Sequence, residues 1–556
     1  MENDRPWLKS YPPGVPADID PSAYDSVVDI LVEATSRFAD KPAFRNLGRT
    51  IDFADLDEMT KRFAAWLQHE TTLEPGDRIA IMLPNLLQHP VAVFGAMRAG
   101  FVVVNTNPLY TERELEHQLK DSGAKAIVVF EAFAVTLEKV LARTEVKHVV
   151  VARIGDLLGF PKRMIVNAVF KHVKKGVPAY RLPGHLRFRD VLAAGERHEP
   201  RPVTLGHDDI AFLQYTGGTT GVAKGAMLTH GNMVANIIQA TQWITVADLE
   251  EGEEIIVTAL PLYHIFALTA NCLTFMKLGA MNLLITNPRD IKGFVKELGT
   301  LRFTVITGVN TLFNALLNDP GFADLDFSGL KVTLGGGMAV QKGVADRWGK
   351  VTGNPLIEAY GLTETSPAAC MNPMTMKEYN DSIGLPISST EASVRDPDNN
   401  AVPLGETGEL CIRGPQVMKG YWQRPDETAR AIDEHGWLHT GDIAKMNEQG
   451  YFKIVDRLKD MILVSGFNVY PNEIESVVAE MEGVLEAGAI GVPDERSGEV
   501  VKVVVVKKDA SLTAEDVKAY CKDKLTGYKR PKIVQFVDEL PKTNVGKILR
   551  RELREL

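Results

Sequence analysis

Apolar residues in the first part of the chain occur in two patterns, short continuous runs and longer runs with a helical period. The segments 76–85, 101–108 and 124–130 contain short apolar runs bounded by turn residues, which is typical of buried strands. The segments 87–100 and 111–123 carry apolar residues at helical spacing, and each ends at a glycine. Repeated strand–helix–strand units predict a mostly parallel sheet covered by helices on both faces.

The pattern changes near 385–455, where short strand-like runs are separated by Gly, Pro and Asn. This region predicts a small antiparallel β subdomain. The elements expected after it are a strand MILVSG, a helix PNEIESVVAEME, a strand VVKVVVVKK and a last helix near 513–525. We therefore predict an α/β protein with a large multi-subdomain N-terminal domain at 1–455, a hinge at 456–460 and a small mobile C-terminal α+β domain at 461–556.

The segment 255–276 has no Asp, Glu, Lys or Arg and is long enough to span a bilayer. It contains Pro261, His264 and Asn271, however, and a break in the backbone is unfavourable in lipid. We expect a buried strand followed by a core helix.

Charge and cysteine content exclude several classes of protein. A net charge of −10 over 556 residues argues against a general nucleic-acid binder, which needs a basic face. The four cysteines are far apart and form no CxxC pair, so neither a zinc site nor a disulfide framework is expected. The start, MENDRPWLKS, lacks the apolar run of a signal peptide, and we expect a cytoplasmic protein.

The segment 215–225, YTGGTTGVAKG, has the composition of a phosphate-binding loop. Glycines let successive backbone N–H groups face an anion, while threonine hydroxyls and a lysine add donors and positive charge. The residues expected to hold phosphates are Thr216, Gly217, Gly218, Thr219, Thr220, Gly221 and Lys224. Lys224 is followed by Gly225 instead of Ser or Thr, so the loop is not a Walker motif.

This loop resembles the phosphate-binding signature of the adenylate-forming superfamily of acyl-CoA synthetases, luciferases and peptide-synthetase adenylation domains. Six further motifs that resemble family signatures follow in order: LPLYHIFAL (260–268), GGGMAV (335–340), YGLTETSP (360–367), HTGDIA (439–444), DRLKDMILVSGFNVYPNEIE (456–475) and PKTNVGKILRREL (541–553). The similarity covers essentially the whole chain and is greatest to bacterial long-chain fatty acyl-CoA synthetases. It implies attack of a carboxylate on the α-phosphorus of ATP, followed by transfer of the acyl group to coenzyme A.

The resemblance assigns roles to residues around the reacting groups. Glu364 matches the magnesium-associated glutamate, with Thr216 as a second oxygen ligand, and Thr363 the hydroxyl that contacts the α-phosphate. Lys547 would bridge the carboxylate and the α-phosphate, neutralising charge as it develops. His264 fits a position near the reacting carboxylate, although an isolated histidine in an apolar run is equally well a hydrogen-bonded core residue.

The resemblance also assigns the nucleotide and coenzyme A contacts. Tyr360 would pack on adenine, Asp442 would accept hydrogen bonds from the ribose hydroxyls, and Arg457 would contact the nucleotide. Backbone at Gly335, Gly336 and Gly337 would approach the adenine and the acyl chain. Lys459 falls at the hinge position, where a rotation would withdraw Lys547 and bring 464–467, including Gly466, to the coenzyme A thiol.

Two apolar segments bear on the substrate. The expected acyl-pocket lining, 265–268 together with 309–317, is mainly apolar, which favours an aliphatic chain. The segment 162–175, plotted as a helix, places Ile165, Val166, Val169, Phe170 and Val173 on one side and mostly basic or polar residues on the other. An interfacial helix on the inner face of the cytoplasmic membrane has this pattern, and so does a surface helix packed on its own domain.

Several alternatives remain open on the sequence. The same chemistry could act on a medium-chain, aryl or phenylpropanoid acid, and a non-catalytic fatty-acid binding or uptake protein could share the fold. The presence of both Lys547 and Glu364 argues against the non-catalytic alternative. The sequence leaves the oligomeric state open, with a homodimer as one option.

Overall fold

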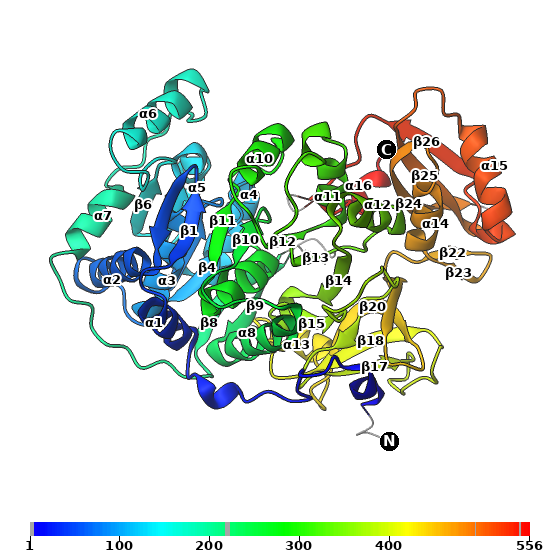
Figure 1. Cartoon of the computed structure of the whole chain (residues 1–556), viewed down its shortest axis with the longest axis horizontal. Helices are drawn as coiled ribbons and strands as arrows, with labels where there is room; N and C mark the ends of the chain where they lie inside the picture. Colours follow the sequence, from blue (N-terminus) through cyan, green and yellow to red (C-terminus); the bar gives the residue numbers. More distant parts are fainter. Residues whose placement is uncertain (1–4, 217–222, 495, 544–545) are drawn as a thin grey trace.

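The computed structural model describes residues 5–216, 223–494, 496–543 and 546–556. Two large, mostly parallel sheets build the N-terminal part, and helices pack between them and around them (Figure 1). A smaller antiparallel sheet lies beneath them, and the C-terminal unit forms a separate lobe at one end (Figure 1). This arrangement confirms the predicted α/β fold, with its β subdomain and small C-terminal domain.

The first large sheet has eight strands in the order β19-β9-β8-β4-β3-β5-β6-β7. Its strands are β3 (Arg78–Met82), β4 (Val102–Asn105), β5 (Ala124–Phe130), β6 (His148–Ala152), β7 (Leu186–Arg187), β8 (Ile210–Thr216), β9 (Lys224–Thr229) and β19 (Gly420–Tyr421). The strands from β7 to β8 are parallel, whereas β9 and β19 add antiparallel pairs at the edge. The phosphate-loop motif therefore connects a parallel strand to its antiparallel neighbour.

The second large sheet has nine strands in the order β16-β15-β14-β13-β12-β10-β11-β1-β2. Its strands are β1 (Pro42–Asn46), β2 (Arg49–Asp52), β10 (Ile255–Thr258), β11 (Met281–Leu284), β12 (Val305–Gly308), β13 (Val332–Gly335), β14 (Leu356–Gly361), β15 (Ala368–Met371) and β16 (Leu385–Pro386). The central pairs are parallel and the outer pairs antiparallel. Because parallel strands end at one edge, β13 and β14 bring their carboxyl ends to the same place.

Helices cover both sheets, as expected from the alternating pattern. They are α1 (Val27–Arg37), α2 (Phe53–His69), α3 (Gln88–Arg98), α4 (Glu112–Ser122), α5 (Ala134–Leu141), α6 (Lys162–Ala168), α7 (Phe188–Gly195), α8 (His230–Ile244), α9 (Thr274–Lys277), α10 (Ile291–Leu298), α11 (Asn310–Leu317) and α12 (Lys342–Thr352). The largest buried cluster includes residues of α1, α3, α8 and both sheets, so these helices pack between them. Helix α4 shows how local sequence sets the ends: Thr111 and Glu114 form a capping box, and Gly123 closes the helix at φ 62°.

The apolar segment 255–276 is a buried strand followed by a helix, as predicted. Strand β10 is followed by a π-helix at Ala267–Leu273 that runs into α9. Within the described part of the chain, no helix combines the length and the hydropathy needed to cross a bilayer.

The antiparallel subdomain has four strands in the order β17-β18-β20-β21. Its elements are β17 (Glu391–Arg395), β18 (Gly408–Arg413), β20 (Leu438–Met446), β21 (Phe452–Arg457) and helix α13 (Pro425–Ala431). The predicted start near 385 is too early, because β16 pairs with β15 and so belongs to the nine-stranded sheet.

The C-terminal unit combines a five-stranded sheet with three helices. Its elements are β22 (Ile462–Val464), β23 (Phe467–Val469), α14 (Pro471–Ala479), β24 (Val484–Asp494), β25 (Gly498–Lys507), α15 (Ala514–Lys524), β26 (Ile533–Val537) and α16 (Arg550–Leu553). The expectation that the helix near 513–525 is the last one is wrong, since α16 follows it. At four residues, α16 is too short to show a period in the sequence.

Candidate active site

The side chains of Tyr360, Asp442 and Arg457 form one connected group. The Tyr360 hydroxyl donates to Asp442 Oδ2 at 2.6 Å, and Arg457 Nε lies 3.1 Å from Asp442 Oδ1. Strand β14 carries Tyr360, while β20 and β21 pair Asp442 directly with Arg457. Burial, together with the adjacent carboxylate, raises the pKa of Tyr360 well above its usual value. Three residues predicted to bind the nucleotide therefore meet at one place.

Lys547 reaches the same place from the C-terminal unit. A Cβ added at Gly337 would lie 3.7 Å from Lys547 Cε. Burial lowers the pKa of Lys547 to about 8; the positive charge of Arg457 also lowers it, whereas the carboxylates of Asp442 and Glu364 oppose the shift. The lysine is thus held among the groups expected to bind the nucleotide and its metal ion.

Gly546, the residue before Lys547, contacts the first turn of α11. The Thr311 hydroxyl donates to the Gly546 carbonyl at 3.3 Å, and Gly546 has a φ of 87°. A Cβ at Gly546 would come within 2.7 Å of the Thr311 hydroxyl oxygen. Glycine is needed here because both the backbone angle and the close approach exclude a side chain.

His264 and the glycine segment also lie near Lys547. A Cβ at Gly336 would lie 3.0 Å from the Phe266 ring, so an aromatic side chain packs directly on this backbone. His264 Nδ1 accepts from the Phe266 N–H at 3.3 Å. Burial, with a contribution from the Lys547 charge, lowers the pKa of His264 to about 3, and the ring is neutral at physiological pH.

Gly335 lies at the end of β13, where close packing fills the space beside it. A Cβ there would come within 2.7 Å of Leu356 and 2.8 Å of Val340. A side chain at this position would force the strand away from its neighbours. Gly337 requires glycine for another reason, because its φ is 76°.

Glu364 is oriented by a tyrosine that the sequence did not single out. The Tyr421 hydroxyl donates to Glu364 Oε1 at 2.7 Å, and the Glu364 carbonyl accepts from the Met418 N–H at 2.8 Å. Glu364 and Thr363 share the short 3-10 helix Thr363–Thr365. Tyr421 follows a glycine in a segment that looks like an ordinary turn, so its role depends on a contact across 57 residues.

The two ends of the phosphate-loop motif are described, and they lie opposite each other. Thr216 pairs with Lys224 across β8 and β9. The Lys224 ammonium lies 5.1 Å from the centre of the Tyr421 ring and forms an ion pair with Glu427. Of the residues predicted to cradle phosphates, Gly217, Gly218, Thr219, Thr220 and Gly221 lie outside the described residues.

Lys459, expected at the hinge, lies near Lys547, whereas Gly466, expected at the coenzyme A thiol, lies apart from it. Lys459 is close enough to Lys547 for its charge to lower the pKa of that lysine. Gly466 lies in the β22–β23 hairpin, where no described atom comes within 4 Å of an added Cβ. The adjacent Phe467 is exposed and stacks on Tyr528 with ring centroids 4.7 Å apart. The structure therefore does not bring Gly466 into the group around Lys547.

Residues of six separate motifs thus lie near one another where the C-terminal unit meets the N-terminal part. This site holds a lysine, a carboxylate oriented by a tyrosine, and an aspartate held between a tyrosine and an arginine. Positive charge beside glycine backbone suits an anhydride-forming reaction between two anions, because it screens their repulsion.

Comparison with known proteins shows the family of the chain. The family model described as "AMP-binding enzyme" matches residues 31–422, and the one described as "AMP-binding enzyme C-terminal domain" matches residues 473–547. A long-chain-fatty-acid–CoA ligase of Escherichia coli O6:H1 is 59% identical over 99% of this chain and 98% of its own length. A long-chain-fatty-acid–CoA ligase of Bacillus subtilis is 37% identical over 100% of this chain and 98% of its own length.

Solved structures give the same picture. ATP-bound MatB from Rhodopseudomonas palustris aligns with a TM-score of 0.81 and 28% identity over 95% of this chain and 98% of its own. The anthranilate CoA ligase AuaEII in complex with anthranoyl-AMP aligns with a TM-score of 0.85 and 24% identity over 97% and 98% of the two chains, which shows the shared fold. With family models matching both its parts and relatives aligned end to end, the chain belongs to the AMP-binding enzyme family.

Proposed function

We propose that this chain is an acid–thiol ligase that joins a long-chain fatty acid to coenzyme A through an acyl-adenylate. ATP is consumed, and AMP and pyrophosphate are released. The observation that carries the proposal is the placement of Lys547 beside Gly337 and near the carboxylates of Glu364 and Asp442. The relatives named above, at 59% and 37% identity over nearly the whole chain, support the substrate class.

In the first half-reaction, a carboxylate oxygen of the acid attacks the α-phosphorus of ATP. The bond from the α-phosphorus to the bridging oxygen breaks, and pyrophosphate leaves with the electron pair. The Lys547 ammonium lies between the acid and the α-phosphate, where it offsets the developing negative charge, and the Thr363 hydroxyl donates to an α-phosphate oxygen. Asp442 holds the ribose hydroxyls, Arg457 supports the nucleotide, and Tyr360 packs on adenine.

Magnesium fits the oxygen donors of this site. The Glu364 carboxylate and the Thr216 hydroxyl are hard oxygen ligands, and Tyr421 fixes one carboxylate oxygen of Glu364 by a hydrogen bond of 2.7 Å. A magnesium ion bound there would neutralise phosphate charge. Lys224 belongs to the proposed phosphate cradle together with Gly217, Gly218, Thr219, Thr220 and Gly221, which lie outside the described residues.

In the second half-reaction, the coenzyme A thiol attacks the acyl carbon, and AMP leaves. We assign residues 1–455 to the adenylate-forming domain, 456–460 to the hinge and 461–556 to a mobile lid. Rotation at Lys459 would withdraw Lys547 and bring Gly466 and its hairpin to the thiol. The exposure of this hairpin and the position of Lys547 beside Gly337 suit the adenylating arrangement.

The proposed acyl site is lined by the segments 265–268 and 309–317. Ile265, Leu268, Val309 and Phe313 are buried apolar side chains of these segments. Each methylene of a substrate removed from water contributes about 0.8 kcal/mol, so an apolar tunnel favours long chains. His264, neutral and next to the apolar wall, is placed to contact the acid without adding charge.

A panel of acids tests this function. We expect pyrophosphate release with ATP, Mg²⁺ and a long-chain acid, acyl-AMP accumulation without coenzyme A, and acyl-CoA formation with it. Faster release with medium-chain or aryl acids would overturn the long-chain assignment. Tight lipid binding without pyrophosphate release from any acid would favour the non-catalytic binding protein.

We also propose that the protein is cytoplasmic and touches the inner face of the membrane through 162–175. This segment is α6 followed by a π-helical turn at Val169–Val173, at one end of the molecule (Figure 1). The expected division of faces is partly wrong. Phe170 points inward, with its ring centroid 5.6 Å from that of Phe130, and Asn167 accepts from the Gly155 N–H at 2.7 Å.

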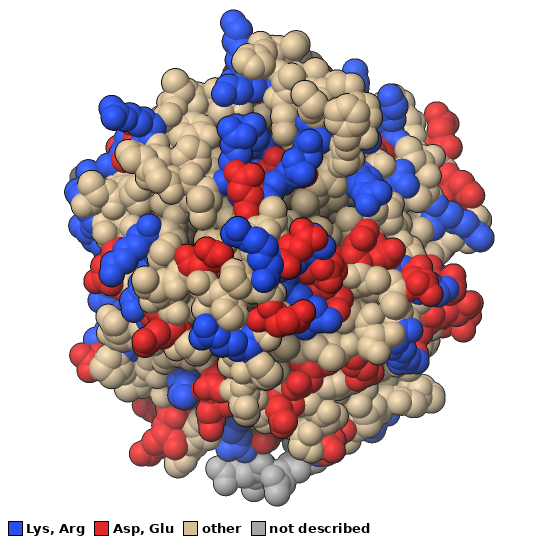
Figure 2. Space-filling model, turned by 90° about the vertical axis from the view of Figure 1, so that its left-hand side faces the viewer, with Lys and Arg blue, Asp and Glu red and all other residues tan. Residues whose placement is uncertain are grey.

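The outward face is more apolar than the helical plot suggested. Its exposed apolar side chains are Phe160 (77%), Met164 (59%), Ile165 (58%), Val169 (39%) and Val173 (72%). Exposed Lys162, Lys171, Lys174 and Lys175 are interspersed with them. Figure 2 shows this end of the molecule, with basic and uncharged side chains dominating its upper part. An apolar face edged by lysines in a chain of net charge −10 complements an anionic lipid surface.

A further inference from the structure

The turn that carries Asp442 is an interruption of the β18–β20 ladder. Glu409 pairs with Ile443 and Cys411 with His439, so two steps along β18 correspond to four along β20. The extra residues form a bulge at 440–442, and Gly441 in its middle has a φ of 70°. Bulges of this kind re-aim a side chain beside an active site and leave backbone groups that the ladder does not satisfy.

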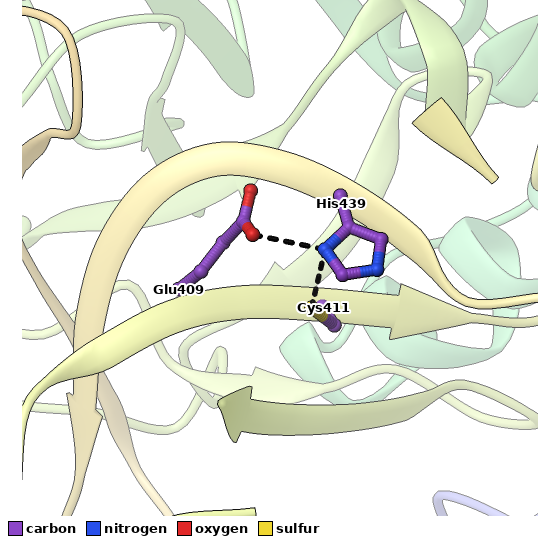
Figure 3. Close-up of side chains that lie close together, drawn as sticks. All are labelled: Glu409, Cys411 and His439. Carbon is purple, nitrogen blue, oxygen red and sulfur yellow. Dashed lines mark hydrogen bonds and ion pairs between the residues drawn. The ribbon is translucent and has the colours of Figure 1, made fainter. Parts of the chain in front are cut away.

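Glu409 binds the bulge with both carboxylate oxygens. Its Oε1 accepts from the Gly441 N–H at 2.9 Å. Its Oε2 lies 2.9 Å from His439 Nδ1, a contact drawn in Figure 3. Thr440 completes the arrangement, because its hydroxyl donates to the Leu410 carbonyl at 2.7 Å and accepts from the Asp442 N–H at 3.1 Å. Side chains thus bond the two backbone N–H groups next to the Asp442 side chain.

Glu409, Cys411 and His439 form a cluster whose atoms of metal-binding type lie within 4.8 Å of one another. Hydrogen bonding explains this cluster, because Glu409 and Cys411 both approach the same nitrogen, His439 Nδ1. Burial raises the pKa of the Cys411 thiol to about 12, so the thiol is protonated at neutral pH. The carboxylate of Glu409 is fully engaged by His439 and the bulge, which indicates a positioning role.

The consequence reaches the nucleotide through Asp442. This carboxylate is 4% exposed and is held between the Tyr360 hydroxyl and the Arg457 guanidinium. The position of this carboxylate relative to the sheet depends on the bulge, because the two extra residues shift residue 442 out of the regular register with β18. If Gly441 turned away, the carboxylate would leave both partners.

We propose that Glu409 is a positioning residue for Asp442: by bonding Gly441 and His439, it fixes the bulge that aims the ribose-binding carboxylate. The inference rests on the proposed contact of Asp442 with the ribose. Glu409 bonds Gly441 and His439 and is not among the residues proposed to contact substrate or nucleotide, so its removal should act on nucleotide recognition and leave the thiol-transfer step intact.

The test compares Glu409→Ala, Glu409→Gln and Asp442→Ala in the full-length enzyme, with ATP and with 2′- and 3′-deoxy-ATP. For Glu409→Ala we expect the KM for ATP in pyrophosphate release to rise about tenfold, with kcat changed less than about threefold. The variant should also lose most of the preference for ATP over the deoxynucleotides, as Asp442→Ala does. Glu409→Gln should stay near the wild type, because its amide oxygen still accepts from Gly441 and its NH₂ can donate to neutral His439.

Glu391→Gln is the matched control, since Glu391 lies on the neighbouring strand β17 and pairs with Arg413 at 2.7 Å. It should leave both KM and nucleotide preference unchanged. Single-turnover transfer from preformed acyl-AMP to coenzyme A should be similar in all Glu409 variants. The positioning role is overturned if Glu409→Ala keeps the wild-type preference while Asp442→Ala loses it, or if Glu409→Ala and Glu409→Gln slow both half-reactions equally. If Asp442→Ala itself keeps the preference, the ribose assignment fails instead, and the inference fails with it.

Discussion

Arg550 Nη1 lies 3.4 Å from Asp456 Oδ1, so the helix after Lys547 is tied to the segment where the C-terminal unit begins. The same guanidinium bonds Glu475 at 2.8 Å and Asp460 at 3.2 Å, and its side chain is 14% exposed. The two ends of the C-terminal unit are thus joined beside the proposed hinge. Because Lys547 lies three residues before Arg550, this group of charges determines where the lysine can reach.

Replacing Arg550 tests that relationship. We expect Arg550→Met to reduce the adenylation rate about tenfold or more, because three carboxylates lose their shared partner and the tail loses its anchor. Pyrophosphate release in a rapid-mixing assay measures the effect. Arg551→Met is the control, because Arg551 lies next to Arg550 on α16 but its side chain is 67% exposed. The rate should stay within about twofold. An Arg550 variant that adenylates at the wild-type rate would contradict the anchoring role.

Lys547→Ala should separate the two half-reactions. We expect acyl-AMP formation to fall by about a hundredfold or more, because a preorganised charge at the α-phosphate is removed. Transfer of the acyl group from added acyl-AMP to coenzyme A should change by less than about threefold, since the lysine acts before that step. Lys542→Ala, which removes a lysine paired with Glu486 in the same tail, should affect neither step strongly. Adenylation at the wild-type rate by Lys547→Ala would contradict the proposed mechanism.

The pKa of Lys547 predicts the pH dependence of adenylation. The ammonium form is the active one, and burial lowers its pKa from 10.5 to about 8 in the free enzyme. The charge is therefore present below pH 8 and is lost as the pH rises through that value. We expect kcat/KM for ATP to decline above about pH 8 with the loss of one proton. In Lys547→Arg the residual activity should show no such decline up to pH 10, because guanidinium stays charged. A decline at the same pH in both enzymes would assign the titration to another group.

Tyr421→Phe tests the orientation of Glu364. The hydroxyl that donates to Glu364 Oε1 is removed, while the ring that faces Lys224 remains. We expect the Mg²⁺ concentration for half-maximal adenylation to rise about five- to tenfold, in line with the loss of one charge-assisted hydrogen bond. Tyr451→Phe, at a half-buried tyrosine of the β subdomain, is the control. Equal Mg²⁺ dependence in all three proteins would show that the contact with Glu364 is dispensable.

Vesicle binding tests the surface at 160–175. Charge reversal at Lys171, Lys174 and Lys175 should weaken binding to anionic vesicles about a hundredfold, since each lysine near the surface contributes about 1 kcal/mol. Phe160→Ser combined with Val173→Ser should weaken binding through loss of the apolar contribution, with less salt dependence than the lysine variant. Reversal of the exposed Lys508, Lys518 and Lys522 in the C-terminal unit is the matched control. If both triple variants bind alike, this face does not contact lipid.

Much of the fold follows from local patterns. The alternation of short apolar runs with helical periods around 76–130 predicted β3, α3, β4, α4 and β5 in order, because backbone propensity and burial of one face act over a few residues. The shift at 385 was placed slightly early, since a two-residue strand such as β16 is recognised by its partner and not by its own sequence.

The candidate site divides in the same way. The resemblance of short motifs to family signatures singled out Lys547, Glu364 and Asp442 one by one. Tyr421, Glu409 and Arg550 were missed, because each acts through a partner 30 or more residues away. The residues next to them in the sequence form no pattern that indicates those contacts.

The sequence alone determined the order of elements, the positions at which the backbone requires glycine, and the set of charged groups that can take part in the site. Only the tertiary structure decided which of these groups meet: Tyr360 and Asp442 are 82 residues apart, yet their oxygens lie 2.6 Å apart. It also decided that Phe170 turns inward while Met164 faces solvent. The reason is physical: local propensities act along the chain, whereas the position of a side chain at a site depends on packing between distant segments.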